Sequence, residues 1–576
     1  MYEYNGALIN RRVWKFFVPG FLATVAVTLS MFLDILLVGR MVGPIEMGAV
    51  QMALPLTMFF NMIYMLLGTG GEVLVASAKG ARNAKRADAM FTLTLAAIVI
   101  VSLTIALLGS VFATQTAGAL AKGNAEMTPM VARYIRVMFL GSPLLIFVMG
   151  CTPFVKADAM PLLASMIAVF SNIVNVGSKL IYMGPMKLGL YGAAFGTVTG
   201  YAAGLLLLCF CYLFNRRRRV LNFVPLTSAD LKEIGNIFLT GLPSSLGQGL
   251  GALTSWASNA IVLSIAGSAG IVAMTVANSC TIFVSSFRYA SPMTIVPLVG
   301  AMCGERDWWS MVQTTRRVMK ICVVGTAFCA ALLLAFPREV LSGFGVKDAC
   351  VMSMGVTALR FFSINVIFSV IINIIMTYYQ TTGRKAASIA ISAGLELIDL
   401  ACRWLCGMYI GIVGLWISPL LGSLIMLVLI FCYARKVEGA SKEGETAYHG
   451  TFLLHERQAN FAEKNTIRPT AEDAEGVAAQ IKLFVERNGI STVRAEEAAR
   501  LIQREALEII KKNGTSAKCI DIMTVVWKGQ VQIKLRDDGP AFAAAETEDS
   551  PITHTAVMGY NDTFILLNPQ NGEEKS

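Results

Sequence analysis

Residues 31–55 read MFLDILLVGRMVGPIEMGAVQMALP, and this stretch decides the fold. It continues an apolar run that begins at about Trp14 and is long enough, as a helix, to cross a hydrocarbon core of roughly 30 Å. Asp34 is the one deeply placed charge in that run. Because a carboxylate inside a membrane span is costly, the sequence predicts a functional role or a charged partner for Asp34.

The composition of the whole chain also indicates a membrane protein. Its 576 residues are 55% hydrophobic and 15% charged, whereas about a quarter of an ordinary soluble domain is charged. The net charge of +11 divides unevenly: residues 1–436 carry 32 Lys+Arg and 15 Asp+Glu, and residues 437–576 carry 16 and 22. The basic excess therefore belongs to the membrane part, where it favours positive cytoplasmic loops over a nucleic-acid surface, and we expect no nucleic-acid partner.

Long apolar runs recur along the chain, and each is long enough to span a bilayer as a helix. We count twelve, at 14–40, 47–76, 90–114, 129–155, 161–183, 190–214, 235–266, 270–302, 314–336, 349–380, 387–410 and 413–434. The predicted fold class is therefore an all-α polytopic membrane protein of twelve transmembrane helices, followed by a small cytoplasmic α/β domain.

Positive charge alternates between the loops. It gathers after spans 2, 6, 8 and 10, at Lys79, Arg82, Lys85, Arg86, Arg216, Arg217, Arg218, Arg219, Arg306, Arg384 and Lys385. The loops after spans 1, 3, 5, 7 and 11 are short or poor in Lys and Arg. The distribution predicts a multi-pass protein of the inner (plasma) membrane with both termini in the cytoplasm.

The twelve spans divide into two similar halves, residues 1–215 and 216–436. Pro19 lies 224 positions before Pro243, and an offset of 222 pairs Gly189 with Gly411. Because each half has six spans, both start on the same side of the membrane, so the repeat is parallel and encloses a cavity of the kind used in alternating access. The halves differ in charge, since Asp34 meets Ser258 at the 224 offset.

Seven short motifs follow one another through roughly residues 10–435. They are DILLVGRMVGP at 34–44, LGTGG at 67–71, YGAAFGT at 191–197, GLP at 241–243, GERD at 304–307, YQTTGR at 379–384 and GLW at 414–416. In this order they resemble the multidrug and toxin extrusion (MATE) family. The resemblance implies export of a bulky, often cationic amphiphile, driven by inward flow of protons or sodium ions, with no further cofactor.

The same resemblance places Asp34 in a coupling-ion site. Many members of the family carry Asn and, four residues later, Asp on the fifth helix, and here these positions read Asn175 and Lys179. We count Asn172, on the same helix, among the candidates. Lys179 reverses the expected charge, so three hypotheses stay open: a fixed ion pair of Lys179 with Asp34, coupling moved to the second half, or loss of the usual coupling. A neighbouring cation would disfavour protonation of a carboxylate.

Other charges fall inside the apolar runs. In span 11, Asp399 and Arg403 are four residues apart and share a helix face with Glu396, which favours a structural ion pair over a second cation site for Asp399 and leaves both open for Glu396. Arg288 and Arg360 are candidates to counter Glu396 or to line a cavity for anionic substrates. Glu72 is expected near the end of its span, where solvation would account for its charge.

After a linker at 437–465, residues 466–576 have a soluble composition. We expect amphipathic helices at 472–488 and 495–513, and strands at 517–527, 530–536 and 563–567. This order, with RDDGPAF at 536–542, resembles the GHKL ATPase fold of histidine kinases and anti-sigma kinases.

The GHKL resemblance implies that Asp537 would hydrogen-bond the adenine amino group and that Gly539 would permit close approach of the nucleotide. It places Glu505 on the helix that should offer a Glu and, four residues later, a magnesium-binding Asn. Ile509 stands where a magnesium-binding Asn is expected, so we interpret the domain as degenerate: ATP binding is doubtful and no metal site is expected. We also expect it to regulate the protein or to contact a cytoplasmic protein.

The sequence thus favours a secondary-active exporter, not an enzyme, that handles an amphiphilic small molecule in a lipid bilayer. Two alternatives remain: a flippase for lipid-linked precursors, and a membrane sensor that signals through its C-terminal domain.

Overall fold

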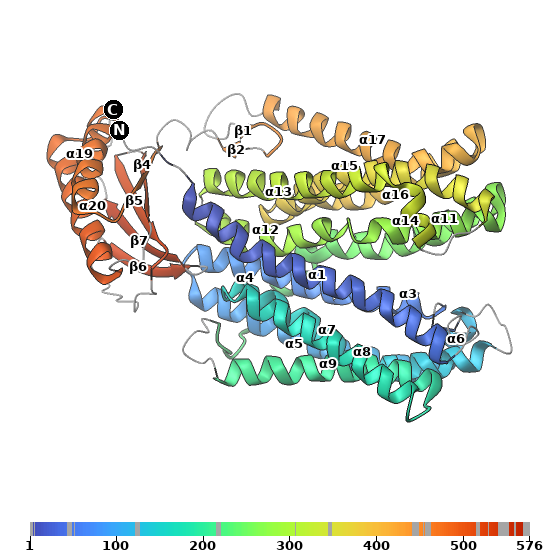
Figure 1. Cartoon of the computed structure of the whole chain (residues 1–576). Coiled ribbons are helices and arrows are strands. Elements are labelled where there is room, and N and C mark those ends of the chain that lie inside the picture. The colour runs from blue at the N-terminus through green and yellow to red at the C-terminus, as the bar shows by residue number, and fades with distance from the viewer. Residues whose placement is uncertain are drawn as a thin grey trace.

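The computed structural model is a long helical bundle with a small α/β domain at one end (Figure 1). The described residues are 4, 6–42, 49–50, 52–120, 127–214, 221–305, 307–343, 348–440, 448–452, 454–455, 462–513, 519–527, 529–539, 552–557 and 560–567. Among them, ten helices are long and apolar enough to cross a membrane, and the bent pair 269–282 and 286–304 makes up to eleven.

The first half is built from five long helices and one composite span. They are α1 (Ala7–Met41), α5 (Ala84–Val111), α7 (Met127–Ala157), α8 (Pro161–Met183), α9 (Gly189–Phe214), and the continuous run α3 (Leu54–Tyr64), η1 (Met65–Thr69) and α4 (Gly70–Gly80), with the short α6 (Ala113–Leu120) beside them. The element η1 is one π-helical turn inside the second span. These elements match the six runs predicted for this half.

The second half repeats the arrangement. Its helices are α10 (Ser228–Leu231), α11 (Ile234–Ile282), α12 (Ser286–Gly304), α13 (Trp308–Ala335), α14 (Pro337–Gly343), α15 (Ala349–Thr381), α16 (Lys385–Ile410) and α17 (Ile412–Ala440). The helix α11 consists of two arms, because Gly267 has φ 66° and breaks it. Only a residue without a Cβ adopts that conformation at low cost.

The repeat is visible in backbone details. Gly189 and Gly411, paired by the 222 offset, both have positive φ, 54° and 73°. Asn83 and Asp307, 224 residues apart, cap the amino termini of α5 and α13 by accepting hydrogen bonds from backbone N–H groups. Local sequence therefore directs the same turns in both halves.

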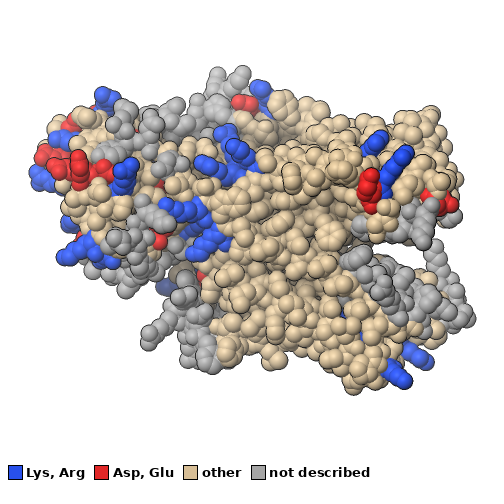
Figure 2. Space-filling view, in the orientation of Figure 1, with Lys and Arg blue, Asp and Glu red and all other residues tan. Residues whose placement is uncertain are grey.

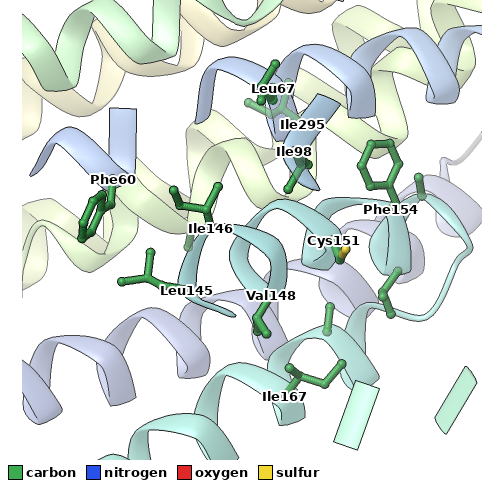
Figure 3. Close-up of a cluster of buried hydrophobic side chains, with 14 of the residues drawn as sticks. Phe60, Leu67, Ile98, Leu145, Ile146, Val148, Cys151, Phe154, Ile167 and Ile295 are labelled. Atoms are coloured by element: carbon green, nitrogen blue, oxygen red, sulfur yellow. The ribbon is translucent and has the colours of Figure 1, made fainter. Parts of the chain in front are cut away.

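The two halves share one apolar core. Figure 3 shows buried side chains of the first half, among them Phe60, Ile98 and Phe154, packed together with Ile295 from α12. Where α4 crosses α12 the backbones touch: a Cβ on Gly80 would lie 1.8 Å from the Ala301 carbonyl oxygen, and one on Gly304 would lie 1.9 Å from that of Ser77. The halves are thus closed against each other at the end that carries the α/β domain.

That end is also where the basic loops gather. Figure 2 shows Lys and Arg concentrated on the bundle next to the C-terminal domain. The predicted basic loops at 216–219 and Arg306 lie outside the described residues.

The C-terminal domain is a five-stranded antiparallel sheet under two helices. The strands, β3 (Ala462–Ile467), β4 (Ile520–Trp527), β5 (Gln530–Asp537), β6 (Ile552–Val557) and β7 (Tyr560–Leu567), have the order β3-β4-β5-β7-β6. Helices α19 (Ala471–Arg487) and α20 (Thr492–Asn513) cover the face that carries Ile522, Ile533 and Ile565. A two-stranded ribbon of β1 (Tyr448–His449) and β2 (Leu454–His455) precedes the sheet.

Two features of this domain differ from the sequence prediction. Strand β3 begins at Ala462, inside the stretch expected to be linker, and the sequence prediction contained no strand at β6. Both are edge strands with mixed polar composition, and therefore lack the apolar run by which the central strands were recognised.

Candidate functional site

Three of the four predicted coupling residues of the first half lie on α8. Asn175 and Lys179 are 9% and 4% exposed, one turn apart on the same helix face. They fit against glycines of α9: the position of a Cβ on Gly196 would lie 2.4 Å from Lys179 Cγ, and that on Gly200 2.7 Å from Asn175 Cβ. Because Gly196 and Gly200 have no side chains, α9 leaves room for Asn175 and Lys179 inside the first half.

Asp34 and Asn172 differ from this pair. The backbone of Asp34 belongs to α1, which packs against α8, but its side chain lies outside the described residues. An ion pair between Asp34 and Lys179 thus remains a prediction. The amide of Asn172 donates a 2.8 Å hydrogen bond to the Ala168 carbonyl of its own helix.

A polar cavity of about 430 Å³ lies between the two arms of α11 and α16. Hydroxyl and amide side chains line much of it, including Thr254, Ser255, Ser258, Asn259, Thr275, Asn278 and Ser279. This volume falls in the range of small-molecule sites, and such convergent polar groups typically orient a ligand. Of these hydroxyl and amide residues, the sequence prediction included only Ser258, although they follow helical spacing, at 254, 255, 258 and 259 on one arm and 275, 278 and 279 on the other.

Two of the three predicted charges of span 11 line this cavity. Arg403 Nη2 lies 3.1 Å from Asp399 Oδ2, so the predicted i, i+4 pair forms, and both residues line the cavity. Glu396 accepts a 2.7 Å hydrogen bond from Thr254 Oγ1. The lining of the cavity thus contains one ion pair, and the lining residue Thr254 is hydrogen-bonded to Glu396, which does not itself line the cavity.

Arg288 and Arg360 have different surroundings. Arg288, on α12, attracts the charge of Glu396 electrostatically, without a hydrogen bond or ion pair between them among the described contacts. Arg360 is exposed on α15 and does not belong to the lining of the cavity between α11 and α16. Of the two arginines, Arg288 therefore fits the predicted role of countering Glu396.

Two charged pairs of the first half were missed. Glu72 is 3% exposed, and its Oε1 lies 3.8 Å from Lys156 Nζ on α7, so its expected solvation near a span end is wrong. Lys79, at the end of α4, forms an ion pair with the buried Asp158. Sequence spacing cannot reveal these pairs, because tertiary packing brings α4 and α7 together.

In the C-terminal domain, Asp537 is fully buried at the end of β5. Its Oδ1 accepts hydrogen bonds from Asn513 Nδ2 at 2.8 Å, Asn561 Nδ2 at 3.0 Å and Gly539 N at 2.8 Å. Burial raises the pKa of Asp537, which these donors partly offset.

The Asn513 side chain also occupies the space beside Gly539: a Cβ on Gly539 would lie 2.2 Å from it. Glu505 is buried on α20 and pairs with Arg504, while Ile509 packs in the domain core. The rest of the predicted motif, residues 540–542, lies outside the described residues.

Comparison with known proteins places the chain in a family. The MatE family profile matches twice, at residues 19–181 and 243–405, two segments separated by the 224 offset of the repeat. The chain is 24% identical over 345 residues to the probable multidrug resistance protein YoeA of Bacillus subtilis, covering 58% of this chain and 73% of YoeA. It is 22% identical over 403 residues to the multidrug export protein MepA of Staphylococcus saprophyticus, covering 69% of this chain and 88% of MepA.

Solved structures share the fold of the bundle. A MOP superfamily transporter from Pyrococcus furiosus, described as having a binding pocket of reverse polarity, has a TM-score of 0.68 at 19% identity and covers 76% of this chain and 97% of its own. The MATE transporter VcmN of Vibrio cholerae has a TM-score of 0.70 at 18% identity, over 76% and 98%. With more than half of its length matched by the family profile, the chain belongs to the MatE family.

Proposed function

We propose that this protein is a secondary-active exporter of amphiphilic, cationic small molecules that works by alternating access. The observation that carries the proposal is the contact of two repeated halves through glycine backbones at one end of the bundle. A repeat of this kind supports alternating access by rigid-body movement of one half against the other, with this end as the one that is closed here. The multidrug relatives favour export over the flippase and sensor alternatives.

The polar cavity between α11 and α16 is our candidate for part of the substrate path. Its hydroxyl and amide groups suit the polar atoms of an amphiphile. Asp399 in the lining, with Glu396 hydrogen-bonded to the lining residue Thr254, supplies negative charge for a cation. Because Arg403 and Arg288 offset that charge, a cationic substrate has to compete with resident guanidinium groups.

For ion coupling, we propose that Lys179 acts as a resident cation for Asp34. The burial of Lys179 within the first half and the packing of α1 on α8 support this assignment. Protons or sodium ions would then drive transport by competing with the lysine for the carboxylate. The same substitution of Lys for an expected Asp makes the polarity of this site the reverse of the family pattern.

We further propose a twelve-span topology with the C-terminal domain in the cytoplasm of the plasma membrane. The ten apolar helices include the first arm of α11. The second arm of α11 joined to α12 is an eleventh span, and α16 is the twelfth. Lys79, Arg82, Lys85 and Arg86 stand at the end that carries the domain, as the positive-inside rule requires.

We also propose that the C-terminal domain is a degenerate GHKL fold without nucleotide turnover. Asp537 is already hydrogen-bonded by three protein donors, and Ile509 fills the place of a metal-binding Asn. The role of the C-terminal domain is then to regulate the transporter or to contact a cytoplasmic protein.

Ethidium export from proteoliposomes under an imposed proton or sodium gradient tests the transport proposal. Wild type should export the dye with one gradient, and Asp34→Asn should abolish the dependence on that gradient. Lys179→Asp should change which ion supports export, while Lys187→Asp, an exposed Lys→Asp control in the loop after α8, should not. Export independent of both gradients, or an unchanged ion profile in Lys179→Asp, would contradict the coupling scheme.

A further inference from the structure

The C-terminal sheet has two faces of opposite chemistry. Along β5, Val531, Ile533 and Leu535 point to the helices, so Lys534 and Arg536 point to the other side. In the adjoining strands, Asp521 and Asp562 stand opposite Arg536, and Lys464 stands opposite Met523. We call Lys464, Asp521, Lys534, Arg536 and Asp562 the charged face.

The charged face is not turned to solvent. Figure 1 shows the sheet lying between its two helices and the end of the bundle. The side chains of Arg536 and Asp562 are 8% and 1% exposed, and those of Lys534 and Lys464 are each 12% exposed. Buried charges need partners, because desolvation without compensation is costly.

The second half of the bundle supplies acidic partners from the loop between α12 and α13. Glu305 pairs with Lys534, and its Oε2 also accepts a 2.7 Å hydrogen bond from Arg536 Nη2. Asp307 Oδ1 lies 3.3 Å from Lys464 Nζ. Burial alone would raise the pKa of Asp307, but Lys464, Lys534 and Arg536 bring it well below its usual range.

The first half supplies cations. The Arg82 guanidinium, in the loop between α4 and α5, lies over the Phe564 ring at 4.3 Å. Near the start of α1, Arg11 pairs with Asp538 and Arg12 lies over the Tyr560 ring at 3.2 Å. The Tyr560 hydroxyl donates a hydrogen bond to the Leu8 carbonyl oxygen.

The two contacting loops are related by the repeat. At the 224 offset, Glu305 and Asp307 take the places of Ala81 and Asn83. Both loops follow glycines, Gly80 and Gly304, at which the backbones of the two halves touch. The domain therefore covers the line of contact between the halves, and binds an acidic loop on one side and basic residues on the other.

From this placement we propose that the C-terminal domain is an internal clamp: its charged face ties the two halves together at their closed end, and the end opens when the domain is released. A group that binds only one of two conformations stabilises that conformation. The inference rests on the proposed function only in that alternating access requires this end to open. A cytoplasmic molecule that competes for the charged face would activate transport.

Distances between spin labels test the clamp on the full chain in lipid nanodiscs without any substrate. Labels carried by genetically encoded residues at Lys85 and Ala386, exposed positions on the two halves, avoid the 12 native cysteines. A second pair at Lys85 and Arg487 reports whether the domain is docked. Wild type should give a single narrow distance distribution for both pairs.

The double variant Glu305→Lys/Lys464→Glu places like charges against the charged face and against Asp307. We expect undocking, together with an increase of about tenfold in the population with a longer Lys85–Ala386 distance. The matched control Glu339→Lys changes an exposed acid on α14 and should alter neither distance. Undocking with the halves still closed, or a domain that stays docked in the double variant, overturns the clamp. Because no dye or gradient is used, either result is independent of whether the protein exports ethidium.

Discussion

The two halves of the bundle share a backbone plan but differ in how they hold charge. The first half buries fixed pairs at its closed end, Glu72 with Lys156 and Lys79 with Asp158. At the 224 offset the second half has Val296 in place of Glu72 and Gln380 in place of Lys156. Gln380 is neutral and bonds to Thr240 O at 2.8 Å and to Ser244 Oγ at 3.0 Å.

The second half instead keeps its charges around open space. Its cavity holds the Asp399–Arg403 pair and hydroxyl groups from both arms of α11. The comparison shows that the two halves share their helices but differ in their interiors: the first half contains buried ion pairs, and the second contains a polar cavity. Three variants test this difference.

The largest effect is expected from breaking the Glu72–Lys156 pair. Lys156→Met should lower the free energy of unfolding by about 3–5 kcal/mol, because it leaves a carboxylate that is 3% exposed without its cation. The double variant Glu72→Gln/Lys156→Gln should recover most of this loss, since two amides can hydrogen-bond to each other. Thermal unfolding of the purified protein measures both. A double variant as unstable as Lys156→Met would mean that the first half does not depend on that ion pair.

The cavity of the second half should control transport more than stability. Ser255→Trp introduces an indole at an exposed lining position and should lower ethidium export by about tenfold, equivalent to about 1.4 kcal/mol. The matched control is Ser264→Trp, on an exposed position of the same helix arm outside the lining. Export rates at equal reconstituted protein give the comparison. Equal rates for both variants would remove the cavity from the substrate path.

Sequence reasoning succeeded where the physical signal is local. Long apolar runs identified the helices because spanning length is a property of one segment, and the spacing of Asp399 and Arg403 predicted their pair. It failed where partners come from distant segments. Nothing near Glu72 in the sequence points to Lys156, and the alternation in β5 shows that Lys534 and Arg536 leave the domain core without showing that Glu305 receives them.

The two halves contact the C-terminal domain through residues of opposite charge. The stability that the carboxylates of this interface contribute should depend on pH in different ways. Asp521 of the charged face accepts a 2.8 Å hydrogen bond from Thr466 and faces Tyr4, Lys464 and Arg536. Burial raises the pKa of Asp521 to about 6 from an ordinary 3.8. Its protonated form is therefore favoured in the folded state, so the stability it contributes is complete below pH 3.8 and is lost as the pH rises through about 6.

Asp307 and Asp562 have the opposite sign. Burial opposes their charged forms, but neighbouring cations hold the pKa of each below its ordinary value. Their contribution is therefore present above that value and is lost only in stronger acid. Between pH 5 and 7 these two carboxylates should contribute a constant stability, so that, of these three aspartates, Asp521 should account for the change in this range.

The smallest expected effect is thus that of Asp521→Asn. In wild type, the free energy of local opening of β4 should fall by about 1 kcal/mol from pH 5 to pH 7, and Asp521→Asn should remove that fall because an amide does not titrate. Hydrogen exchange of the β4 amides in the full chain, corrected for intrinsic rates at each pH, measures it. Asp473→Asn, which changes an acid in the first turn of α19, is the control and should keep the wild-type slope. A slope that persists in Asp521→Asn would assign the pH dependence to another group of the interface.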